Sequence, residues 1–303
     1  HSLRRRQRQM CIRDRCMLAP EFLPVWGGVG SYTVELVRHL PEEVEVHVVT
    51  PYRKGIGKYR VSSSEYDFSK YFGKNVHIHF VSSASDTFFY NAVFQYAVAR
   101  YVPKLIKSED IDIIHSHTAH MSDILLQFRH IKSSILTTIH TTIKGQRDGT
   151  RESGLSFWEL ESSEKATFLM YPVLRIIEEM YFMKDRYYVT VSNWMKRNLL
   201  KQYPILADKE IHVIHNAVDI DLFSPSPPSA EVAQGKDVVL FTGRMISAKG
   251  IDVLVRSIPL VLKEKRDVLF LFVGSGNPDP YIRRLRELNV PTSNYKFLGY
   301  VKS

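Results

Sequence analysis

The sequence predicts an α/β protein of two domains, each built on a doubly wound parallel sheet, with the second domain incomplete. Short apolar runs alternate with longer helical patterns along the chain, as expected of parallel strands joined by helices. The alternation stops at a segment rich in proline and serine and then restarts, which indicates a second domain. Only three strands follow that segment, fewer than an open parallel sheet normally has.

In the first domain, seven apolar or alternating runs predict strands. They lie at 16–19, 44–49, 76–81, 111–115, 135–139, 187–191 and 211–214. Helical patterns lie at 31–40, 87–107, 121–130, 159–184 and 193–201, and polar excursions at 51–75 and 143–158. Ser31 and Ser192 are expected N-caps. Pro103 is expected to break or end the second helix, and Pro172 to kink the fourth.

The second domain repeats the pattern on a smaller scale. Strands are expected at 237–242, 267–273 and 295–299, and helices at 250–264 and 279–288. We expect a linker at 224–235, because its Pro and Ser residues favour an extended, semi-rigid chain. The first domain then covers 16–223 and the second 236–303.

The charge is concentrated at the start of the chain. Residues 1–15 hold six arginines against one aspartate, and so carry +5 of the net charge of +9. They show no helical or strand period, and we expect a non-native or disordered leader; a basic interaction arm is the alternative. The basic composition is therefore weak evidence for binding nucleic acid.

Other compositional features exclude several classes of protein. Two cysteines, one of them in the leader, cannot build a disulfide framework or a cysteine-based zinc site. No uninterrupted apolar run approaches the ~20 residues that cross a bilayer. We expect a cytoplasmic protein, with peripheral contact to the inner face of a membrane left open.

The segment 243–250 has the features of a phosphate site. An apolar strand leads to Gly243 and Arg244, and a short loop ends in Lys249 before the next helix. Free N–H groups, a helix dipole and fixed cations converge at such a turn, so Arg244 and Lys249 are predicted to hold a diphosphate. Two solvated cations on an ordinary loop are the alternative.

Two further glycine-rich turns follow predicted strands. In the loop 27–30, Gly28 and Gly30 would let a ligand approach backbone N–H groups, although Thr33 stands where a dinucleotide fingerprint needs glycine. Gly274 and Gly276 would let a nucleotide approach from the other side of the same site. The alternative for both is a turn that binds nothing.

Histidines mark two further strand ends. His115, His117 and His120 could ligate zinc, near the pattern of metallo-β-lactamases, except that Ala119 replaces the acidic residue of that pattern. Packed or cleft-lining histidines are the alternative. His140 follows another strand at the edge where open α/β sheets bind ligands, and can donate a hydrogen bond to a sugar hydroxyl. A structural role is the alternative there.

Taken together, these segments resemble the group 1, or family 4, retaining glycosyltransferases, whose two Rossmann-like domains form the GT-B architecture. The matching segments, in the order of the family, are Gly27–Gly30, Ile139–Thr141, Val191-Ser192, Asn216–Asp219 with Phe223, Gly243-Arg244 with Lys249-Gly250, Phe272–Gly276 and Phe297–Tyr300. Ala217 stands where the family usually has glycine.

The resemblance implies a nucleotide-diphosphate-sugar donor bound by the second domain and an acceptor bound by the first, with no metal or other cofactor required. Arg244 and Lys249 would neutralise the leaving diphosphate, and His140 would lie near the transferred sugar. Gly28 and Gly30 would belong to the loop over the phosphates and acceptor, and Gly243, Gly274 and Gly276 to the nucleotide site. The acceptor would be a carbohydrate, a lipid-linked molecule or a small molecule, and no nucleic acid is implied.

The family also carries a pair of glutamates, eight residues apart, beyond the position where this chain stops. We therefore expect this chain to be a second-domain truncation with impaired activity. Three alternatives stay open: a nucleotide-sugar epimerase of the same architecture, a metal-dependent hydrolase using the histidines of 115–120, and a non-catalytic binding domain.

Overall fold

The structure is a computed structural model of the 303-residue chain. It describes residues 14–23, 27–53, 63, 67–84, 90–118, 121–225 and 235–301. Most of the expected leader and of the Pro-rich linker lies outside these ranges, as does His120.

The first sheet has seven parallel strands in the order β3-β2-β1-β4-β5-β6-β7, which confirms the predicted doubly wound sheet. The strands are β1 (Arg15–Leu18), β2 (Val46–Arg53), β3 (Val76–Ala84), β4 (Ile113–His117), β5 (Ser134–Ile139), β6 (Tyr187–Thr190) and β7 (Ile211–Val213). The strand numbers fall from β3 to β1 and then rise from β4 to β7, so the strand order reverses between β1 and β4. Open α/β sheets bind ligands at such a switch point.

The start of the fold lies slightly earlier than predicted. Arg15, which the sequence assigns to the leader, pairs with Val46 of β2 and Ile113 of β4. The carbonyl of Asp14 accepts hydrogen bonds from two backbone N–H groups of the segment that enters β4. Assigning residues 14 and 15 to the leader is therefore wrong, because a high density of charge concealed the first strand pairing.

The helix after β1 begins earlier than predicted. Helix α2 (Gly28–Arg38) starts three residues before Ser31, whose N–H donates to the carbonyl of Gly27 at 2.9 Å. Gly27 is the N-cap residue, so the prediction of Ser31 as N-cap is wrong. Gly28 and Gly30 consequently lie in the first turn of a helix and not in a loop.

The helix predicted at 87–107 is present, but its expected break at Pro103 and the helix predicted at 121–130 are wrong. Helix α3 (Tyr90–Glu109) continues through Pro103, because Val102 and Leu105 on either side are buried in the core. The predicted helix at 121–130 is a series of turns and one 3₁₀ helix, η3 (Leu126–Phe128). Met121 has a φ of 44°, which is incompatible with a right-handed helix there.

The segment after β5 is more helical than its composition indicates. Helix α4 (Ile143–Glu152) occupies most of the expected excursion at 143–158, followed by a 3₁₀ turn, η4 (Phe157–Glu159). The predicted single helix at 159–184 is two helices, α5 (Ser162–Leu169) and α6 (Tyr171–Phe182). Pro172 is tolerated because it lies in the first turn of α6, where its missing N–H costs little. Helix α7 (Asn193–Gln202) begins as predicted, with the Ser192 hydroxyl oxygen accepting the N–H of Met195 at 3.1 Å.

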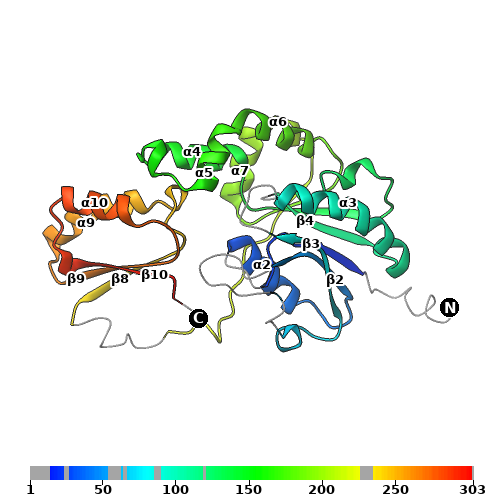
Figure 1. Ribbon diagram of the computed structural model, residues 1–303, viewed down its shortest axis with the longest axis horizontal. Helices are drawn as coiled ribbons and strands as arrows, with labels where there is room; N and C mark the ends of the chain where they lie inside the picture. Colours follow the sequence, from blue (N-terminus) through cyan, green and yellow to red (C-terminus); the bar gives the residue numbers. More distant parts are fainter. Residues whose placement is uncertain are drawn as a thin grey trace. The chain divides into compact units, whose positions relative to one another are not determined.

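The second sheet has three parallel strands in the order β10-β9-β8. The elements are β8 (Asp237–Thr242), α9 (Ile251–Glu264), β9 (Val268–Val273), α10 (Asp279–Glu287) and β10 (Tyr295–Gly299), in close agreement with the prediction. Both helices lie on the same face of this sheet (Figure 1). Leu240 of β8 is 59% exposed, so part of the other face is open in the described part of the chain.

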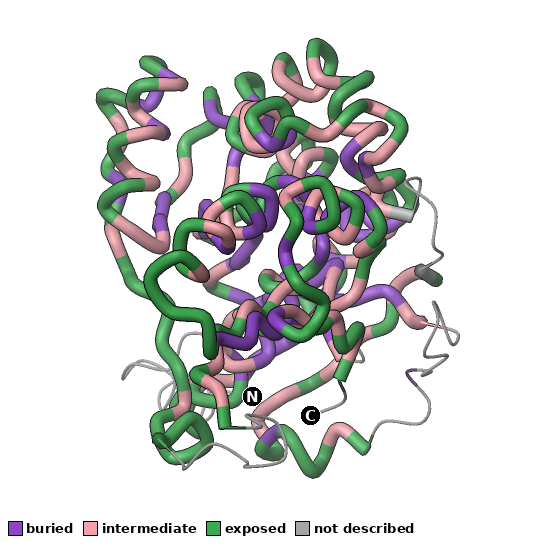
Figure 2. Tube along the Cα trace, turned by 90° about the vertical axis from the view of Figure 1, so that its left-hand side faces the viewer, coloured by how far each residue is buried: buried purple, intermediate pink, exposed green. Residues whose placement is uncertain are grey.

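The chain forms two compact units with separate cores. The first contains residues up to 142 together with 176–216, and the second contains 143–175 together with 217–303. This division differs from the predicted boundaries, because the helices after β5 pack with the second sheet: Leu155 contacts the core formed by Ile251, Phe270 and Phe272. Buried segments follow the strands and the inner faces of the helices (Figure 2).

Candidate functional site

In the first unit, three segments meet at the carboxyl edge of the sheet beside its switch point. They are the first turns of α2, the end of β4 at His117, and His140, which follows β5. The ring of Tyr32 lies edge-on against His140, with 4.7 Å between ring centroids. The structure thus brings His140 next to the helix that carries Gly28 and Gly30.

A chain of hydrogen bonds orients His140 from behind. The Thr33 hydroxyl donates to the Val29 carbonyl at 2.8 Å and lies 3.3 Å from His117 Nε2. His117 Nδ1 in turn lies 3.1 Å from His140 Nε2. His117 is fully buried, whereas His140 is half-buried and within reach of a ligand. Sequence reasoning did not single out Thr33 or Tyr32 for this role.

Because the Thr33 hydroxyl has a single proton, the donor and the acceptor of each hydrogen bond in this series can be assigned. Since the hydroxyl donates to Val29, its oxygen accepts from His117 Nε2, and a neutral His117 then accepts at Nδ1. His140 therefore carries its proton on Nε2 and donates it to His117. In this tautomer of neutral His140, Nδ1 is the acceptor nitrogen. A hydrogen bond between His140 and a sugar hydroxyl stays a prediction.

The histidines of β4 do not form a metal site in the described structure. His115 is 3% exposed and its Nε2 lies 2.8 Å from the Thr138 hydroxyl. Burial, together with the charges of Arg15 and His140, lowers the pKa of His115 to about 3. Among the described residues no group of three His, Cys, Asp or Glu side chains is placed to hold a metal ion. The geometry gives the metal-dependent hydrolase no support.

In the second unit, the two predicted loops lie against each other. The N–H of Met245 donates to the carbonyl of Ser275 at 2.7 Å, and Met245 bridges to Gly276. A Cβ at Gly274 would lie 1.8 Å from the carbonyl oxygen of Gly243. Gly274 is therefore required by the contact between the loops themselves, independently of any ligand.

The side chains of Arg244 and Lys249, in the first of these loops, are exposed. Neither makes a hydrogen bond or an ion pair with another residue in the described ranges. Lys249 ends a 3₁₀ turn, η6 (Ser247–Lys249), and Gly250, with a φ of 73°, leads directly into α9. Two cations close to the start of a helix, with no internal partner in the described structure, suit an anionic ligand.

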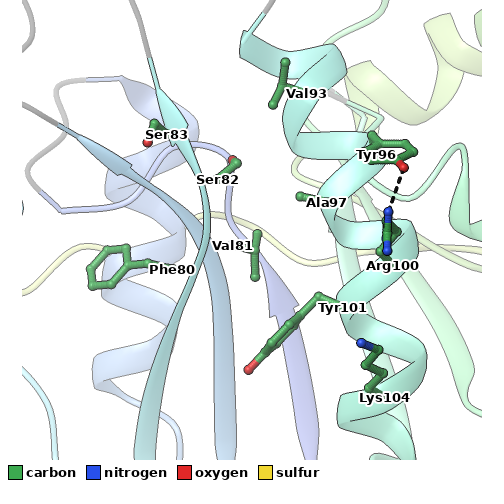
Figure 3. Close-up of a pocket in the computed structure, with 10 residues that line it drawn as sticks. All are labelled: Phe80, Val81, Ser82, Ser83, Val93, Tyr96, Ala97, Arg100, Tyr101 and Lys104. Atoms are coloured by element: carbon green, nitrogen blue, oxygen red, sulfur yellow. Dashed lines mark hydrogen bonds between the residues drawn. The ribbon is translucent and has the colours of Figure 1, made fainter.

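A groove of about 490 Å³ lies elsewhere in the first unit, between β3 and α3 (Figure 3). Tyr96 and Arg100 of α3 line it and are hydrogen bonded at 3.0 Å. None of the predicted site residues lines this groove. It lies at the edge of the sheet, since β2 separates β3 from β1.

Comparison with known proteins identifies the family. The model of Glycosyltransferase Family 4 matches residues 26–222, and that of Glycosyl transferases group 1 matches residues 236–303. The first match alone covers well over half of the chain. The chain therefore belongs to the family 4, group 1 glycosyltransferases, as its motifs predicted.

Two curated relatives illustrate the range of this family. The phosphatidylinositol N-acetylglucosaminyltransferase GPI3 subunit of Saccharomyces cerevisiae (strain YJM789) is 26% identical over 268 residues, which cover 86% of this chain and 52% of the relative. The phosphatidyl-myo-inositol mannosyltransferase of Mycolicibacterium smegmatis is 26% identical over 288 residues, covering 94% and 64%. The chain thus spans about half of the first relative's length and less than two thirds of the second's.

Solved structures confirm the GT-B fold. TarM aligns with a TM-score of 0.59 at 13% identity, over 97% of this chain and 78% of TarM. WaaG, a glycosyltransferase involved in lipopolysaccharide biosynthesis, aligns at 0.54 and 14% identity, over 95% and 70%. A UDP-N-acetylglucosamine 2-epimerase from Listeria monocytogenes, described as putative, also aligns, at 0.50 and 11% identity over 96% and 70%. Transferases and epimerases share this fold, so the match to the family models, and not the fold, distinguishes them.

Within the described ranges, every helix is too short or too polar to cross a membrane.

Proposed function

We propose that this protein transfers a sugar from a nucleoside-diphosphate sugar to an acceptor, with retention at the anomeric carbon and without a metal. The observation that carries the proposal is the placement of Arg244 and Lys249. Both are exposed cations on a loop that closes onto a second glycine-containing loop at the carboxyl edge of a parallel sheet. Family membership supplies the class of reaction.

In this mechanism the two cations act on the leaving group. Cleavage of the bond between sugar and diphosphate develops negative charge on the phosphate and positive character on the sugar. Cations fixed at the diphosphate stabilise that charge as it forms, which is the usual way in which a preorganised site lowers such a barrier. With no carboxylate nucleophile assigned, attack from the front face, with the departing phosphate as base, accounts for retention; this step follows from the family resemblance.

His140 is proposed to orient the transferred sugar. The hydrogen-bond chain from Thr33 through His117 supports this role, because it holds the ring in one tautomer and one orientation. Gly28 and Gly30, in the first turn of α2, are proposed to let the acceptor or the donor phosphates approach the backbone at the same edge.

The acceptor is proposed to be lipid-linked, with carbohydrates and small molecules as the other classes. Two relatives are named for phosphatidylinositol and its mannosylation, which supports a lipid-linked acceptor. We propose that the protein works in the cytoplasm, at the inner face of a membrane, where such acceptors lie.

Nucleotide binding tests the proposal directly. UDP, GDP and ADP are titrated by calorimetry into the wild-type protein and into Arg244→Ala, with Lys263→Ala as a control that removes an exposed cation of α9. We expect Arg244→Ala to weaken the tightest of the three by at least about tenfold, or about 1.4 kcal/mol, and the control to leave it unchanged. Equal affinity in Arg244→Ala and wild type would overturn the site assignment.

The epimerase is distinguished by its products. An epimerase releases an epimer or free sugar from the donor without an acceptor, whereas a transferase needs the acceptor to turn over. Incubation with the donor that binds, with and without a phosphatidylinositol vesicle, separates the two by the sugar products that appear.

A further inference from the structure

One helix end supplies carboxylates to both loops of the candidate diphosphate site. Helix α5 has Glu161 as its N-cap residue and Glu164 at its third position. The two form a capping box in which the Glu161 N–H donates to Glu164 Oε2 at 3.1 Å. One oxygen of each carboxylate, Glu164 Oε1 and Glu161 Oε1, also accepts from the loops that follow β8 and β9.

Glu164 holds the loop that carries the two cations. Its Oε1 accepts the backbone N–H of Ser247 at 3.0 Å and also the Ser247 hydroxyl. Ser247 opens the 3₁₀ turn that ends at Lys249, so the carboxylate caps that turn from a segment 83 residues away in the chain. Glu164 is 9% exposed and Ser247 4%, which makes this a buried, charge-assisted contact.

Glu161 holds the second loop in the same way. Its Oε1 accepts the backbone N–H of Asn277, the residue after Gly276, at 3.0 Å. Glu159, just upstream, forms an ion pair with Arg283 of α10. Helix α4 also lies against the first loop, since a Cβ on Gly149 would be 3.4 Å from the Ala248 side chain. One segment therefore fixes both loops relative to each other.

The two glutamates do not neutralise the cations. Their oxygens accept N–H and O–H groups, and no ion pair joins them to Arg244 or Lys249 in the described structure. A carboxylate that fixes the backbone while leaving the cations available is suited to orient those cations toward a ligand.

We propose that Glu164, assisted by Glu161, is a positioning residue for diphosphate binding. This inference rests on the proposed function, because it takes the loop of Arg244 and Lys249 as the diphosphate site. The same contacts could instead compete with the ligand, if the carboxylates occupy N–H groups that the diphosphate needs. Removal of Glu164 would then strengthen diphosphate binding, whereas removal of a positioning residue weakens it.

The test compares Glu164→Ala with Glu164→Gln, using whichever of UDP, GDP and ADP binds the wild type most tightly, and the matching nucleoside. We expect Glu164→Ala to weaken the diphosphate by at least about tenfold and the nucleoside by less than about twofold. Glu164→Gln keeps an oxygen acceptor for Ser247 and should stay within about threefold of wild type. Equal weakening of the diphosphate and the nucleoside in a folded Glu164→Ala variant would overturn the inference.

Other outcomes also decide the question. Tighter diphosphate binding in Glu164→Ala, or unchanged binding, would overturn positioning. If Glu164→Ala does not fold, Glu161→Ala replaces it in the test, because Glu161 is less buried and its removal breaks the contact with Asn277. We expect Glu161→Ala to weaken binding of the diphosphate and not of the nucleoside. Unchanged diphosphate affinity would refute the inference. If wild type binds none of the three diphosphates while Glu164→Ala still speeds exchange of the Ser247 amide, the contact is real, but the proposed function is wrong and the inference falls with it.

Discussion

The candidate site residues of the first unit and those of the second unit are held in place by different means. In the first unit, the side chain of His140 is oriented by buried side chains, His117 and Thr33, that belong to the same unit and lie behind it. In the second unit, the backbone of the loop is fixed by Glu164, and the charged side chains stay exposed. The His140 ring must present one particular nitrogen, so its orientation has to be fixed. Arg244 and Lys249 have long, flexible side chains, so only the backbone that carries them has to be fixed. The difference teaches that preorganisation can act on the side chain or on the loop beneath it.

The largest effect is expected from breaking the buried polar network of the first unit. Arg186 and Asp123 form a fully buried ion pair at 2.7 Å, and Tyr181 donates to the same carboxylate at 2.6 Å. Asp123→Ala leaves the guanidinium buried without its charge partner, so the free energy of unfolding should fall by about 3–5 kcal/mol. Urea denaturation followed by circular dichroism measures it. Asp185→Ala, which removes the exposed partner of Lys209, should show no measurable change, and equal losses in both variants would contradict this account.

An intermediate effect is expected from forcing the two loops of the second unit apart. Gly274→Ala places a methyl group on the Gly243 carbonyl and strains a φ of 148°, which should cost about 3 kcal/mol of folding free energy. Gly235→Ala is the matched control, because its φ of 75° is also positive but its Cβ would meet nothing within 4 Å. It should cost only about 1 kcal/mol. Indistinguishable unfolding midpoints for the two variants would show that contact between the loops is unimportant.

The smallest effect is expected from titration of His115. Its pKa of about 3 in the folded protein lies below its ordinary value, so protons bind the unfolded chain more readily. Stability should therefore be complete above pH 6.5 and decline as the pH falls toward 3, with a loss from this residue of about 2 kcal/mol between pH 7.5 and 5. His115→Gln should flatten the pH dependence of unfolding. A slope unchanged by His115→Gln would refute the assignment.

Sequence patterns predicted the strands well because each strand is defined by its own apolar run. The cap at Ser192 was also predictable, since a cap depends on residues three positions apart. Helix α4 was not, because two glycines, at 145 and 149, lower its intrinsic tendency to form a helix. Its contact with the turn at Ala248 depends on a segment far away in the sequence.

The same reasoning explains which parts of the site were found. His140, Gly243, Arg244 and Gly274 directly follow their strands, so the local pattern placed them at strand ends. His117 was considered only as a metal ligand, although the adjacency of β4 and β5 would have placed it beside His140. Glu164 gave no local signal, because its contact with Ser247 joins segments that only the folded chain brings together.

The assignment of residues 143–175 to the second unit has a consequence for how this protein can be recombined. A chimera joined within 224–235 would exchange the second sheet but leave Glu161 and Glu164 behind with the first. The loops that carry Arg244 and Asn277 would then meet a segment that had packed against other loops. Exchange of this candidate site between relatives should therefore require both stretches of chain to move together, because the residues that form and support it are not contiguous in sequence.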